Sequence, residues 1–391
     1  MKLKKTFPFL IMMASCDLIV RLLPQMRKQE RFAFLVHPRS SYDAANKYPF
    51  FNLLPQKIVN FILKYLWPIT ASKIEGLKSK DNKPIRGWLI GVPLTPRQMT
   101  EDRNLARKRI IQAAELAVKK GAKIIGLGAL NASFTRGGLD IVDYFSKKNI
   151  KAGITNGKSY TSWIVTRNVM EMIKIFGFDL KFVKIAVVGA AGSIGSACAH
   201  ILLKEGVKNM LLIDTERKKD SLECLVNDFF NLSPEISIKI SYKISDVKKS
   251  DIIIAATNAP EAKIKSEDLR SGSIVIDDAQ PSDVDPEIIK TRNDVLVIEG
   301  GLIHAPGINP HINFGLKHKE DIYCCLGETM ALAYADYDKN FSIGKLDFSS
   351  INTIINIAQK LEFRLAEFQN FQKVISPEDI ERVKCIKNAL K

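Results

Sequence analysis

Short apolar runs alternate with longer stretches of helical spacing along the chain from residue 31 onward. Many of these runs are rich in Ile and Val, which is typical of buried strands. They predict strands over 32–37, 87–93, 123–128, 152–155, 185–188, 210–214, 236–242, 251–255, 273–277 and 295–298. Helical spacing predicts helices over 100–120, 160–176, 320–337 and 349–368. Strands that alternate with helices in this way indicate βαβ units and a parallel sheet.

We therefore expect an α/β protein in which an N-terminal α/β domain precedes a Rossmann domain, a doubly wound parallel sheet. Helices near the C-terminus are expected to pack across both domains. The expected parts are a basic, apolar extension at 1–30, an α/β substrate domain at 31–175, a dinucleotide-binding domain at 176–305 and a helical segment at 306–391. A length of 391 residues agrees with two domains or three.

The strongest local motif is the stretch KIAVVGAAGSIGSACAHIL. In a turn of this kind Gly189 permits the tight bend, Gly192 lets the backbone approach a pyrophosphate, and Gly195 lets the helix and strand pack closely. We expect the turn to bind a dinucleotide through Gly189, Ala190, Ala191, Gly192, Ser193, Ile194 and Gly195. The alternative is a Rossmann domain that has lost its ligand.

The choice between NADH and NADPH depends on the end of the next strand. Asp214 lies 19 residues after Gly195, where an acidic side chain binds the ribose hydroxyls of NAD. Arg217 and the two lysines after it could instead hold the 2′-phosphate of NADP. Asp214 slightly favours NADH, and both cofactors stay open. After a later strand, Ala256 and Thr257 lie where loops pass the nicotinamide ribose.

The segment YCCLGE, in the helix expected over 320–337, contains the candidate nucleophile. Adjacent helical residues point about 100° apart, so Cys324 and Cys325 cannot both face one site. A thiol near a helix N-terminus is more readily ionised to the reactive thiolate. Glu328 lies about one turn after Cys325 and could orient a reacting group or accept a proton. From these residues alone, a small buried core cysteine is the plainer interpretation.

The charge is unevenly distributed. Lys and Arg number 58 against 42 Asp and Glu, a net charge of +16, and residues 1–80 hold fourteen of the basic but only four of the acidic residues. A basic end favours an acidic partner or a phospholipid surface. We expect no nucleic-acid binding, because no motif that reads DNA or RNA is recognisable. The six Cys have no CxxC spacing, which indicates reduced thiols, and we expect no metal site.

The N-terminal extension combines basic and apolar residues. Three lysines within the first five residues precede an apolar stretch at 7–14, which resembles a short signal peptide. Apolar character resumes after Asp17, and a helix on a membrane surface explains this better than cleavage. We expect a cytoplasmic protein, with peripheral membrane contact or a structural arm as the options for this segment. A second apolar stretch, 50–67, predicts an amphipathic core helix or the wall of an apolar substrate channel.

Several segments together resemble the long-chain acyl-(acyl-carrier-protein) reductases of the cyanobacterial type, which form fatty aldehydes. The resemblance spans roughly residues 31–360. It is carried by GLGA at 126–129, ITNGKSYT at 154–161, the glycine turn at 189–196, the strand at 293–301 and YCCLGETMALAYADYDKNFSIGK at 323–345. The TNG segment before the Rossmann strand, with C-x-x-E-x-M and N-F-S-x-G after it, is the most specific part.

This resemblance implies that a cysteine takes the acyl group from a thioester and that a hydride from reduced nicotinamide then gives the aldehyde. By position the matching cysteine is Cys325. The implied acyl donor is acyl carrier protein or acyl-CoA, and both suit a basic surface. Two features depart from the family: Asp214 precedes the basic residue with which the family reads NADPH, and the extension of about 30 residues is additional.

Four further polar residues have weaker support. Lys158, in the TNG segment, is a candidate catalytic residue that would line the site, whereas Ser159 and Tyr160 beside it suit helix capping and packing equally well. His304 could donate a proton to a nascent alkoxide, although a structural role is the plainer interpretation.

The expected function is therefore NAD(P)H-dependent reduction of a long-chain acyl thioester to a fatty aldehyde through an acyl-Cys325 intermediate. One alternative is an oxidoreductase with the shikimate- or methylenetetrahydrofolate-dehydrogenase arrangement, in which hydride is transferred directly and Lys158 acts as acid/base. Another is a non-catalytic protein at a membrane surface that binds NAD(P)H or an acyl chain as a regulatory ligand.

Overall fold

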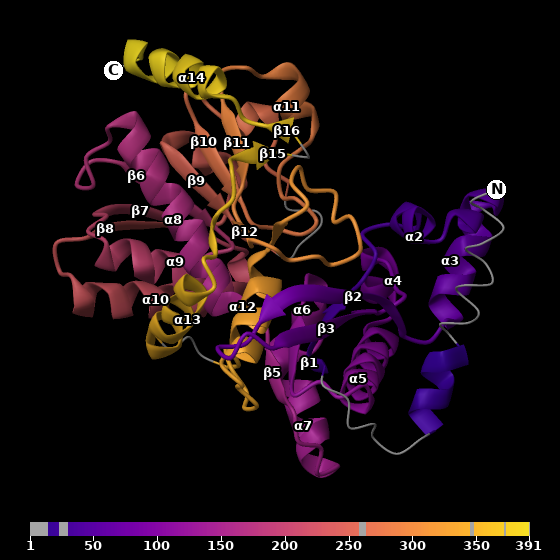
Figure 1. Ribbon diagram of the computed structural model, residues 1–391. Helices are drawn as coiled ribbons and strands as arrows, with labels where there is room; N and C mark the ends of the chain where they lie inside the picture. Colours follow the sequence, from indigo (N-terminus) through magenta and orange to yellow (C-terminus); the bar gives the residue numbers. More distant parts are fainter. Residues whose placement is uncertain (1–14, 23–29, 258–262, 345–347, 371–372, 391) are drawn as a thin grey trace. The chain divides into compact units, whose positions relative to one another are not determined.

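A computed structural model describes residues 15–22, 30–257, 263–344, 348–370 and 373–390 (Figure 1). Contacts divide the chain into two compact units. Unit 1 comprises Met1–Gly157, Ala305–Phe314 and Cys325–Phe363, and unit 2 comprises Lys158–His304, Gly315–Cys324 and Arg364–Lys391. Each unit is therefore built from three separate stretches of chain. The lysines and apolar run at 1–14, expected to begin the N-terminal extension, lie outside the described residues.

Unit 2 contains a sheet of six parallel strands in the order β8-β7-β6-β9-β10-β11. The strands are β6 (Lys184–Val188), β7 (Asn209–Ile213), β8 (Ser237–Ser241), β9 (Ile252–Ala255), β10 (Ile274–Asp277) and β11 (Leu296–Glu299). This order, with the first strand beside the centre, is that of a doubly wound Rossmann sheet. The Rossmann fold predicted from the sequence is confirmed, and the strands lie close to their predicted positions.

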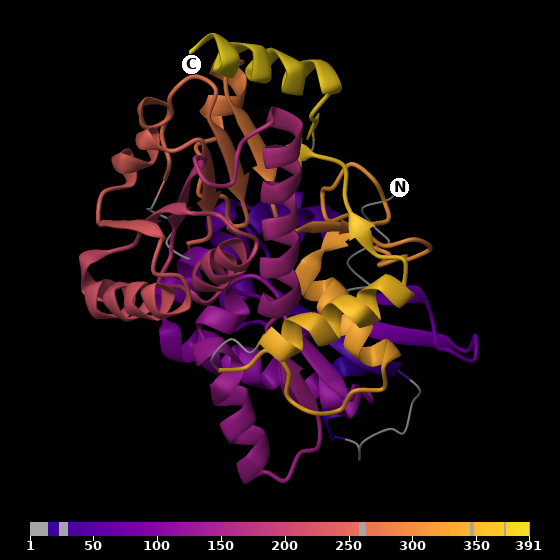
Figure 2. The same ribbon diagram turned by 90° about the vertical axis from the view of Figure 1, so that its left-hand side faces the viewer.

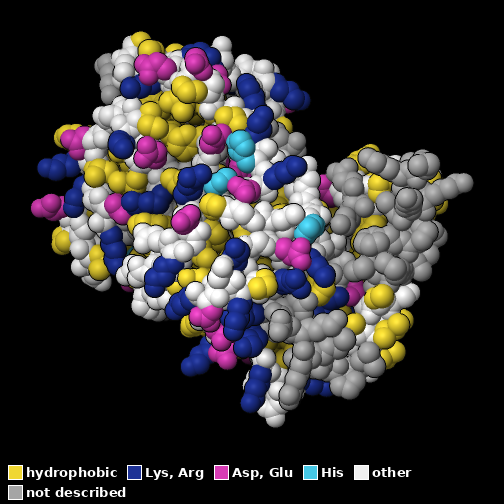
Figure 3. Space-filling view, in the orientation of Figure 1, with side chains coloured by type: hydrophobic (Ala, Val, Ile, Leu, Met, Phe, Trp, Pro, Cys, Tyr) yellow, Lys and Arg dark blue, Asp and Glu magenta, His cyan; other side chains and the backbone are white. Residues whose placement is uncertain are grey.

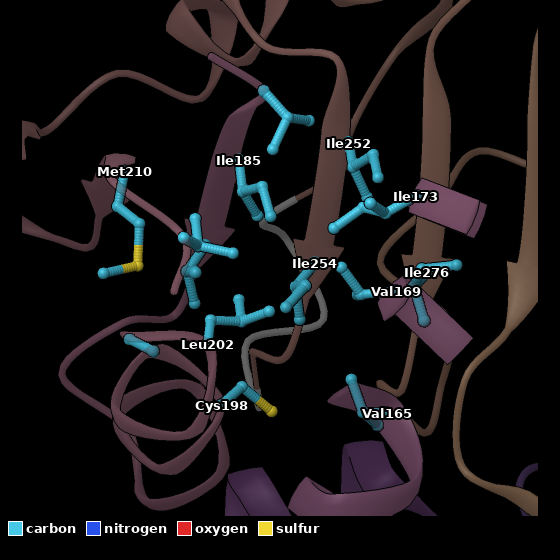
Figure 4. Close-up of a cluster of buried hydrophobic side chains, with 14 of the residues drawn as sticks. Val165, Val169, Ile173, Ile185, Cys198, Leu202, Met210, Ile252, Ile254 and Ile276 are labelled. Carbon is cyan, nitrogen blue, oxygen red and sulfur yellow. The ribbon is translucent and has the colours of Figure 1, made fainter. Parts of the chain in front are cut away.

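Alternate side chains of these strands point to opposite faces of the sheet. One face is covered by α8 (Lys158–Phe176), α9 (Ser193–Lys204) and α10 (Lys219–Leu232). Figure 4 shows Ile254 on this face, near Val169 of α8 and Leu202 of α9. Ile253 points to the other face, where it packs with Val247. That face is covered by η4 (Ile244–Lys249) and α11 (Glu287–Thr291), with η5 (Ser266–Asp268) beside them.

Unit 1 contains a five-stranded sheet in the order β2-β3-β1-β4-β5. The strands are β1 (Glu30–Val36), β2 (Ile69–Lys78), β3 (Pro84–Gly91), β4 (Ile124–Leu127) and β5 (Gly153–Thr155). β2 runs antiparallel to β3, and the other pairs are parallel. The sequence pattern did not predict β2. Its pairing with β3 has register shifts between Thr70 and Ser72 and between Ile74 and Leu77, which interrupt regular alternation.

The helix expected over 100–120 is two helices, which corrects the prediction. They are α4 (Pro96–Glu101) and α5 (Arg103–Lys119). Asp102 separates them, and its carboxylate accepts a hydrogen bond of 2.9 Å from the N–H of Leu105 as the N-cap of α5. α5 and α7 (Leu139–Lys147) pack against one face of the unit 1 sheet. The short α6 (Leu130–Ser133) and η2 (Arg136–Gly138) lie between β4 and α7.

The chain after residue 318 is only partly helical, which corrects the expected run of helices. Asp321–Tyr323 is strand β13 and pairs with β12 (Leu302–His304), so the helix expected over 320–337 begins only at Cys324. The helices here are α12 (Cys324–Tyr334), α13 (Phe348–Lys360) and α14 (Pro377–Ala389). The short strands are β14 (Arg364–Leu365), β15 (Gln369–Asn370) and β16 (Lys373–Val374). α14 lies at one end of unit 2 in Figures 1 and 2.

The N-terminal part of unit 1 carries further helices. They are a helix at residues 15–22, α2 (Ser41–Lys47), η1 (Pro49–Leu53) and α3 (Gln56–Tyr65). The apolar stretch at 50–67 therefore forms most of η1 and all of α3. Val59 and Leu63 of α3 are buried with Phe51 of η1, whereas the opposite side of α3 is exposed. Within the described ranges, no helix is both long enough and apolar enough to cross a bilayer.

Candidate functional site

The candidate site residues fall into two groups, each described within its own unit. Unit 2 holds the glycine turn, Asp214, Arg217, Ala256, Thr257 and Lys158. Unit 1 holds Cys325 and Glu328, together with most of the TNG segment.

The glycine turn joins β6 to α9. Gly189 has a φ of +81°, a conformation that favours glycine. Its N–H and that of Ala190 donate to the carbonyl oxygen of Ile213 at 2.8 and 3.1 Å, and the N–H of Gly192 donates to Gly189 O at 2.8 Å. α9 begins at Ser193, and its N-cap residue, Gly192, has no side chain with which to cap the first turn. This is the arrangement in which helix N–H groups bind a pyrophosphate.

Close packing explains why glycines occupy the turn. A Cβ atom at Gly195 would collide with the carbonyl oxygen of Gly189, and one at Gly189 would lie 2.5 Å from the carbonyl oxygen of Ala256. Ala190 is fully buried in the hydrophobic cluster between the Rossmann sheet and the helices α8, α9 and α10, and Ile194 packs against this cluster. The residues present therefore fit a dinucleotide, because the backbone is open to close approach and no bulky side chain fills the turn.

Asp214 follows β7 and is attached to the glycine turn. Its Oδ2 accepts a hydrogen bond of 3.0 Å from the N–H of Ala191 and lies 3.4 Å from Nζ of Lys218. The Asp214 side chain is only 6% exposed. Arg217 lies in η3 (Glu216–Lys218) and is exposed. The structure therefore brings Asp214 to the turn but leaves Arg217 on the surface of η3.

The loop after β9 is anchored by a residue that sequence reasoning missed. Asp283 accepts two hydrogen bonds from Thr257, one from its N–H at 2.8 Å and one from its hydroxyl at 2.7 Å. Burial raises the pKa of Asp283 to about 6; the Thr257 hydroxyl opposes this shift and the charge of Asp277 adds to it. Ala256 N–H donates to Val188 O at 3.0 Å, which ties the loop to β6. Asp283 is 26 residues from Thr257, and no sequence pattern connects them.

Cys325 is the second residue of α12 and is partly exposed, whereas Cys324 is 1% exposed. Gly157, the glycine of the TNG segment, approaches Cys325 very closely. A Cβ atom at Gly157 would collide with the Cβ and Cα atoms of Cys325, and the φ of Gly157 is +79°. The TNG segment therefore lies directly against the candidate nucleophile.

Glu328 is fully buried and accepts a short hydrogen bond from the hydroxyl of Thr155, which is also fully buried. The same hydroxyl oxygen accepts a hydrogen bond of 3.4 Å from the N–H of Gly157. Thr155 therefore connects Glu328 on α12 to the loop that contacts Cys325. Thr155 belongs to the TNG segment but was not predicted as a site residue.

The segment that follows α12 also contacts β5. Asn340 Oδ1 accepts a hydrogen bond of 3.0 Å from the N–H of Ile154, and Phe341 pairs with Thr155 in a parallel bridge. On α12, Thr329 approaches β4 so closely that a Cβ atom at Gly126 would collide with its hydroxyl. The segments GLGA, TNG, C-x-x-E and N-F-S, which carry the resemblance, thus meet in one part of unit 1. Asn340 is a third site residue that sequence reasoning missed, although its motif was recognised.

Lys158 follows Gly157 and begins α8. Its side chain is 3% exposed, and Ser159 and Tyr160 are buried as well. Ser159 lies inside the first turn of α8, so it is not the N-cap that the capping interpretation expected. Burial raises the pKa of Tyr160, and Cys324 adds to the shift, so Tyr160 is neutral at physiological pH. A catalytic role for Lys158 stays a prediction.

His304 lies at the end of β12 that is farther from α12. Leu302 pairs with Tyr323, directly before α12, whereas His304 pairs with Asp321. Its Nδ1 is 3.0 Å from Oδ1 of the buried Asp321, which also accepts a hydrogen bond of 3.3 Å from Gln369. This network favours a structural role. In the described part of the chain, no three His, Cys, Asp or Glu side chains are arranged to hold a metal ion.

Known proteins are similar to this chain over different lengths. The model of the family described as shikimate / quinate 5-dehydrogenase matches residues 171–299. The aminotransferase PigE of Serratia sp. is 24% identical over 347 residues, which are 85% of this chain and 39% of that protein. The long-chain acyl-[acyl-carrier-protein] reductase of Synechococcus elongatus is 26% identical over 281 residues, 68% of this chain and 78% of that protein. The glutamyl-tRNA reductase of Caldivirga maquilingensis is 34% identical over 108 residues, 27% of this chain and 25% of that protein.

The chain thus spans less than half the length of the Serratia protein. The similarity to the Synechococcus reductase agrees with the resemblance seen in the motifs, although an identity of 26% does not assign the chain to that family. The matched family model includes the glycine turn, Asp214 and Thr257. Together with the geometry of the turn, this similarity assigns an NAD(P)(H)-binding site to unit 2. The comparisons support NAD(P)-dependent oxidation or reduction as the general class of chemistry.

Proposed function

We propose that the protein reduces a long-chain acyl thioester, carried by acyl carrier protein or coenzyme A, to a fatty aldehyde with NAD(P)H. The observation that carries this proposal is the contact between Gly157 of the TNG segment and Cys325 at the start of α12. A partly exposed thiol at a helix start, with a glycine against it to leave space, suits a nucleophile better than a core residue.

In the first step the thiolate of Cys325 attacks the carbonyl carbon of the thioester. A C–S bond to Cys325 forms, the C–S bond to the carrier breaks, and the carrier thiolate leaves and takes up a proton. The first turn of α12 supports this step, because its N–H groups stabilise the negative charge of a thiolate. The buried Lys158, next to Gly157 in the chain, is the proposed source of the proton.

In the second step, a cofactor held by the glycine turn would supply the hydride that reduces the acyl group on Cys325. The C–S bond to Cys325 then breaks, which returns the thiolate and releases the aldehyde. The thioester, NAD(P)H and one proton thus give aldehyde, free thiol and NAD(P)+. Thr257, held by Asp283, and Asp214, held by Ala191, are proposed to fix the two ribose ends of the cofactor.

Glu328 is proposed as a positioning residue. It is fully buried and its carboxylate is engaged by Thr155, so it fixes the helix that presents Cys325. Glu328→Gln keeps an acceptor for the Thr155 hydroxyl and is expected to retain most acylation. Glu328→Ala is expected to slow acylation strongly without changing its pH profile, whereas loss of a general base would change that profile.

Intact-protein mass spectrometry tests the covalent step. The protein is incubated with palmitoyl-CoA or palmitoyl-acyl-carrier-protein without nucleotide, as wild type, Cys325→Ala and Cys324→Ala. We expect a palmitoyl adduct on the wild type and on Cys324→Ala but not on Cys325→Ala. Because Cys16, Cys224 and Cys385 are exposed, peptide mapping of the adduct excludes adventitious acylation. Addition of NADH or NADPH should discharge the adduct and release hexadecanal.

A second candidate is a dehydrogenase that transfers hydride directly, favoured by the family model over residues 171–299 and by the buried Lys158. It predicts no adduct from either donor and full activity of Cys325→Ala with an alcohol or ketone substrate. Tight NAD(P)H binding without turnover of any thioester or alcohol would instead indicate a binding protein. Either result would overturn the thioester mechanism.

A further inference from the structure

The outer side of α3 is apolar although it faces solvent. Ile58, Phe61 and Tyr65 recur at helical spacing and are 46%, 65% and 59% exposed. Val59 and Leu63 on the inner side are buried. α3 therefore has two apolar faces, of which the hydrophobic core of unit 1 covers only one.

The helix at residues 15–22 reverses the usual orientation of an amphipathic helix. Its charged Asp17 is 1% exposed and accepts hydrogen bonds from the N–H and hydroxyl of Thr70, at 2.6 and 2.9 Å, and pairs with Lys120 at 2.9 Å. Arg21 donates a 2.6 Å hydrogen bond to the carbonyl oxygen of Pro68. The charged side thus attaches the helix to unit 1.

The apolar side of this helix points outward. Leu18 and Ile19 are each 55% exposed and Leu22 is 80% exposed. Arg21 also lies 5.1 Å from the ring centre of Trp67, two residues after the end of α3. The two helices are therefore joined through the segment at 67–70. We define the apolar face as Leu18, Ile19, Leu22, Ile58, Phe61 and Tyr65.

Exposed hydrophobic side chains concentrate in this part of the protein. Fourteen large hydrophobic side chains are exposed among the described residues, and nine of them lie between Leu18 and Trp67. Hydrophobic side chains are visible at the lower right of the view in Figure 3, over the helix at 15–22. An exposed cluster of this kind marks an interaction surface.

The exposed charged side chains of α3 are basic. Lys57 and Lys64 are exposed on α3, four residues before and three residues after Phe61, so they flank its ring on the same side of the helix. The sequence contains no Asp or Glu between Asp43 and Glu75. The charge on α3 is therefore complementary to an anionic surface.

We propose that the apolar face docks on an anionic phospholipid bilayer. Aromatic and aliphatic side chains on one side of a helix, with flanking lysines, are typical of helices that lie in the membrane interface. Trp and Tyr favour the headgroup level, where Tyr65 and Trp67 would lie. An acidic carrier protein would match the lysines but would leave the large aliphatic side chains without an apolar partner. This proposal does not depend on the proposed reaction.

Vesicle binding tests the proposal. The full chain is mixed with vesicles of phosphatidylcholine alone, or with about a third phosphatidylglycerol, and bound protein is separated by flotation. We expect binding to the anionic vesicles that weakens as salt is raised. Trp67 is 52% exposed whereas Trp88 is 9% exposed, so lipid with brominated chains should quench fluorescence in the wild type but much less in Trp67→Phe.

Matched variants test the surface itself. Phe61→Ser should lower vesicle affinity about tenfold, since a phenylalanine side chain is withdrawn from the apolar phase. Phe182→Ser in unit 2 is the control, because Phe182 is 74% exposed and lies outside the apolar face. Both side chains face solvent, so thermal unfolding should be nearly unchanged. Absence of binding, equal loss in both variants, or binding to an acidic carrier protein or a second copy through Phe61 would overturn the proposal.

Discussion

Gly157 lies so close to Cys325 that its position has no room for a side chain. Gly157 has a left-handed φ, and it has no space for a side chain. Both features arise because the chain turns sharply against the first turn of α12. The identity of one glycine in the TNG segment is thus explained by the position of a thiol 168 residues later.

Gly157→Ala is expected to reduce acylation of Cys325 at least tenfold, because the added methyl group must displace the backbone of α12. Gly177→Ala is the control: Gly177 has a φ of +65°, but nothing lies within 4 Å of an added Cβ. Both variants should lose about 1 kcal/mol of stability, because alanine is strained at a left-handed φ. Only Gly157→Ala should lose the adduct in mass spectrometry. Equal acylation of the two variants would contradict the close contact.

Asp283 is expected to make stability depend on pH. Because burial raises its pKa to about 6, the folded state holds the proton more tightly than the unfolded chain. The contribution of protonated Asp283 to the free energy of unfolding is therefore complete below the unfolded pKa of about 4, and it is lost as the pH rises through 6. Between pH 4 and 7 this loss should amount to roughly 2–3 kcal/mol of the free energy of unfolding.

Urea unfolding across this pH range should show a smaller decline in Asp283→Asn than in the wild type. Asp338→Asn, which removes an exposed carboxylate of unit 1, should follow the wild type. A decline of the same size in Asp283→Asn would mean that other buried acids, such as Asp277, account for the pH dependence.

At the scale of elements, the buried strands were predictable, whereas the edge strand β2 was not. β6, β9 and β10 are covered on both faces, so nearly every residue is apolar and the run is visible in the sequence. β2 pairs with β3 alone and contains the polar residues Ser72, Lys73 and Glu75. α14 was missed although Ser376-Pro377-Glu378-Asp379 forms a capping box with Pro at the first position.

Asp214, directly after β7, is hydrogen-bonded to the glycine turn, and this position predicts the cofactor preference. Asp214→Asn keeps an oxygen that can accept from Ala191 but removes the negative charge that repels a 2′-phosphate. We expect the ratio of NADPH to NADH affinity to rise about tenfold in this variant, measured by titration of nicotinamide fluorescence. Asp220→Asn, an exposed acid in the first turn of α10, should leave the ratio unchanged. An unchanged ratio in Asp214→Asn would show that Asp214 does not reach the ribose.

At the scale of the whole molecule, motifs identified which segments matter but not which side chains pair. Thr155 and Asn340 lay within recognised segments, yet their partners, Glu328 and Ile154, are 173 and 186 residues away. Asp283 had no motif at all. Such pairings depend on the order of the strands in the sheet and on the crossovers that bring distant turns to one edge. The hydrophobic periodicity of a single segment therefore cannot predict them.

Lys387 attaches α14 to the Rossmann sheet of unit 2. Its Nζ lies 2.5 Å from Oδ1 of Asp251, directly before β9, and Arg270 also pairs with Asp251. Burial alone would raise the pKa of Asp251, but the hydrogen bonds from Lys387 and the N–H of Lys184 and the charges of Lys387 and Arg270 lower it. The contribution of ionised Asp251 to stability is therefore present above the pKa that Asp251 has in the unfolded chain. It is lost as the pH falls through the pKa that Asp251 has in the folded protein.

Lys387→Met should lower the free energy of unfolding by about 1–3 kcal/mol at neutral pH, since a largely buried carboxylate loses one of its two cationic partners. Lys384→Met on the same helix is the control, because its ion pair with Glu381 is at 3.9 Å and partly exposed. Denaturant unfolding checks both variants. An equal effect of the two would mean that α14 is held by its apolar contacts rather than by this pair.

The interleaving of the two units has a consequence for synthesis. The sheet of unit 1 leaves the ribosome within the first 155 residues, but α12 and α13, which also belong to unit 1, are translated only after every strand of the Rossmann sheet. Until then the surface around Gly126 and Thr155 lacks the helix that covers it. Unit 1 is therefore begun first but is completed only after every strand of the Rossmann sheet has been made, and no single cut in the chain can release either unit as a continuous fragment.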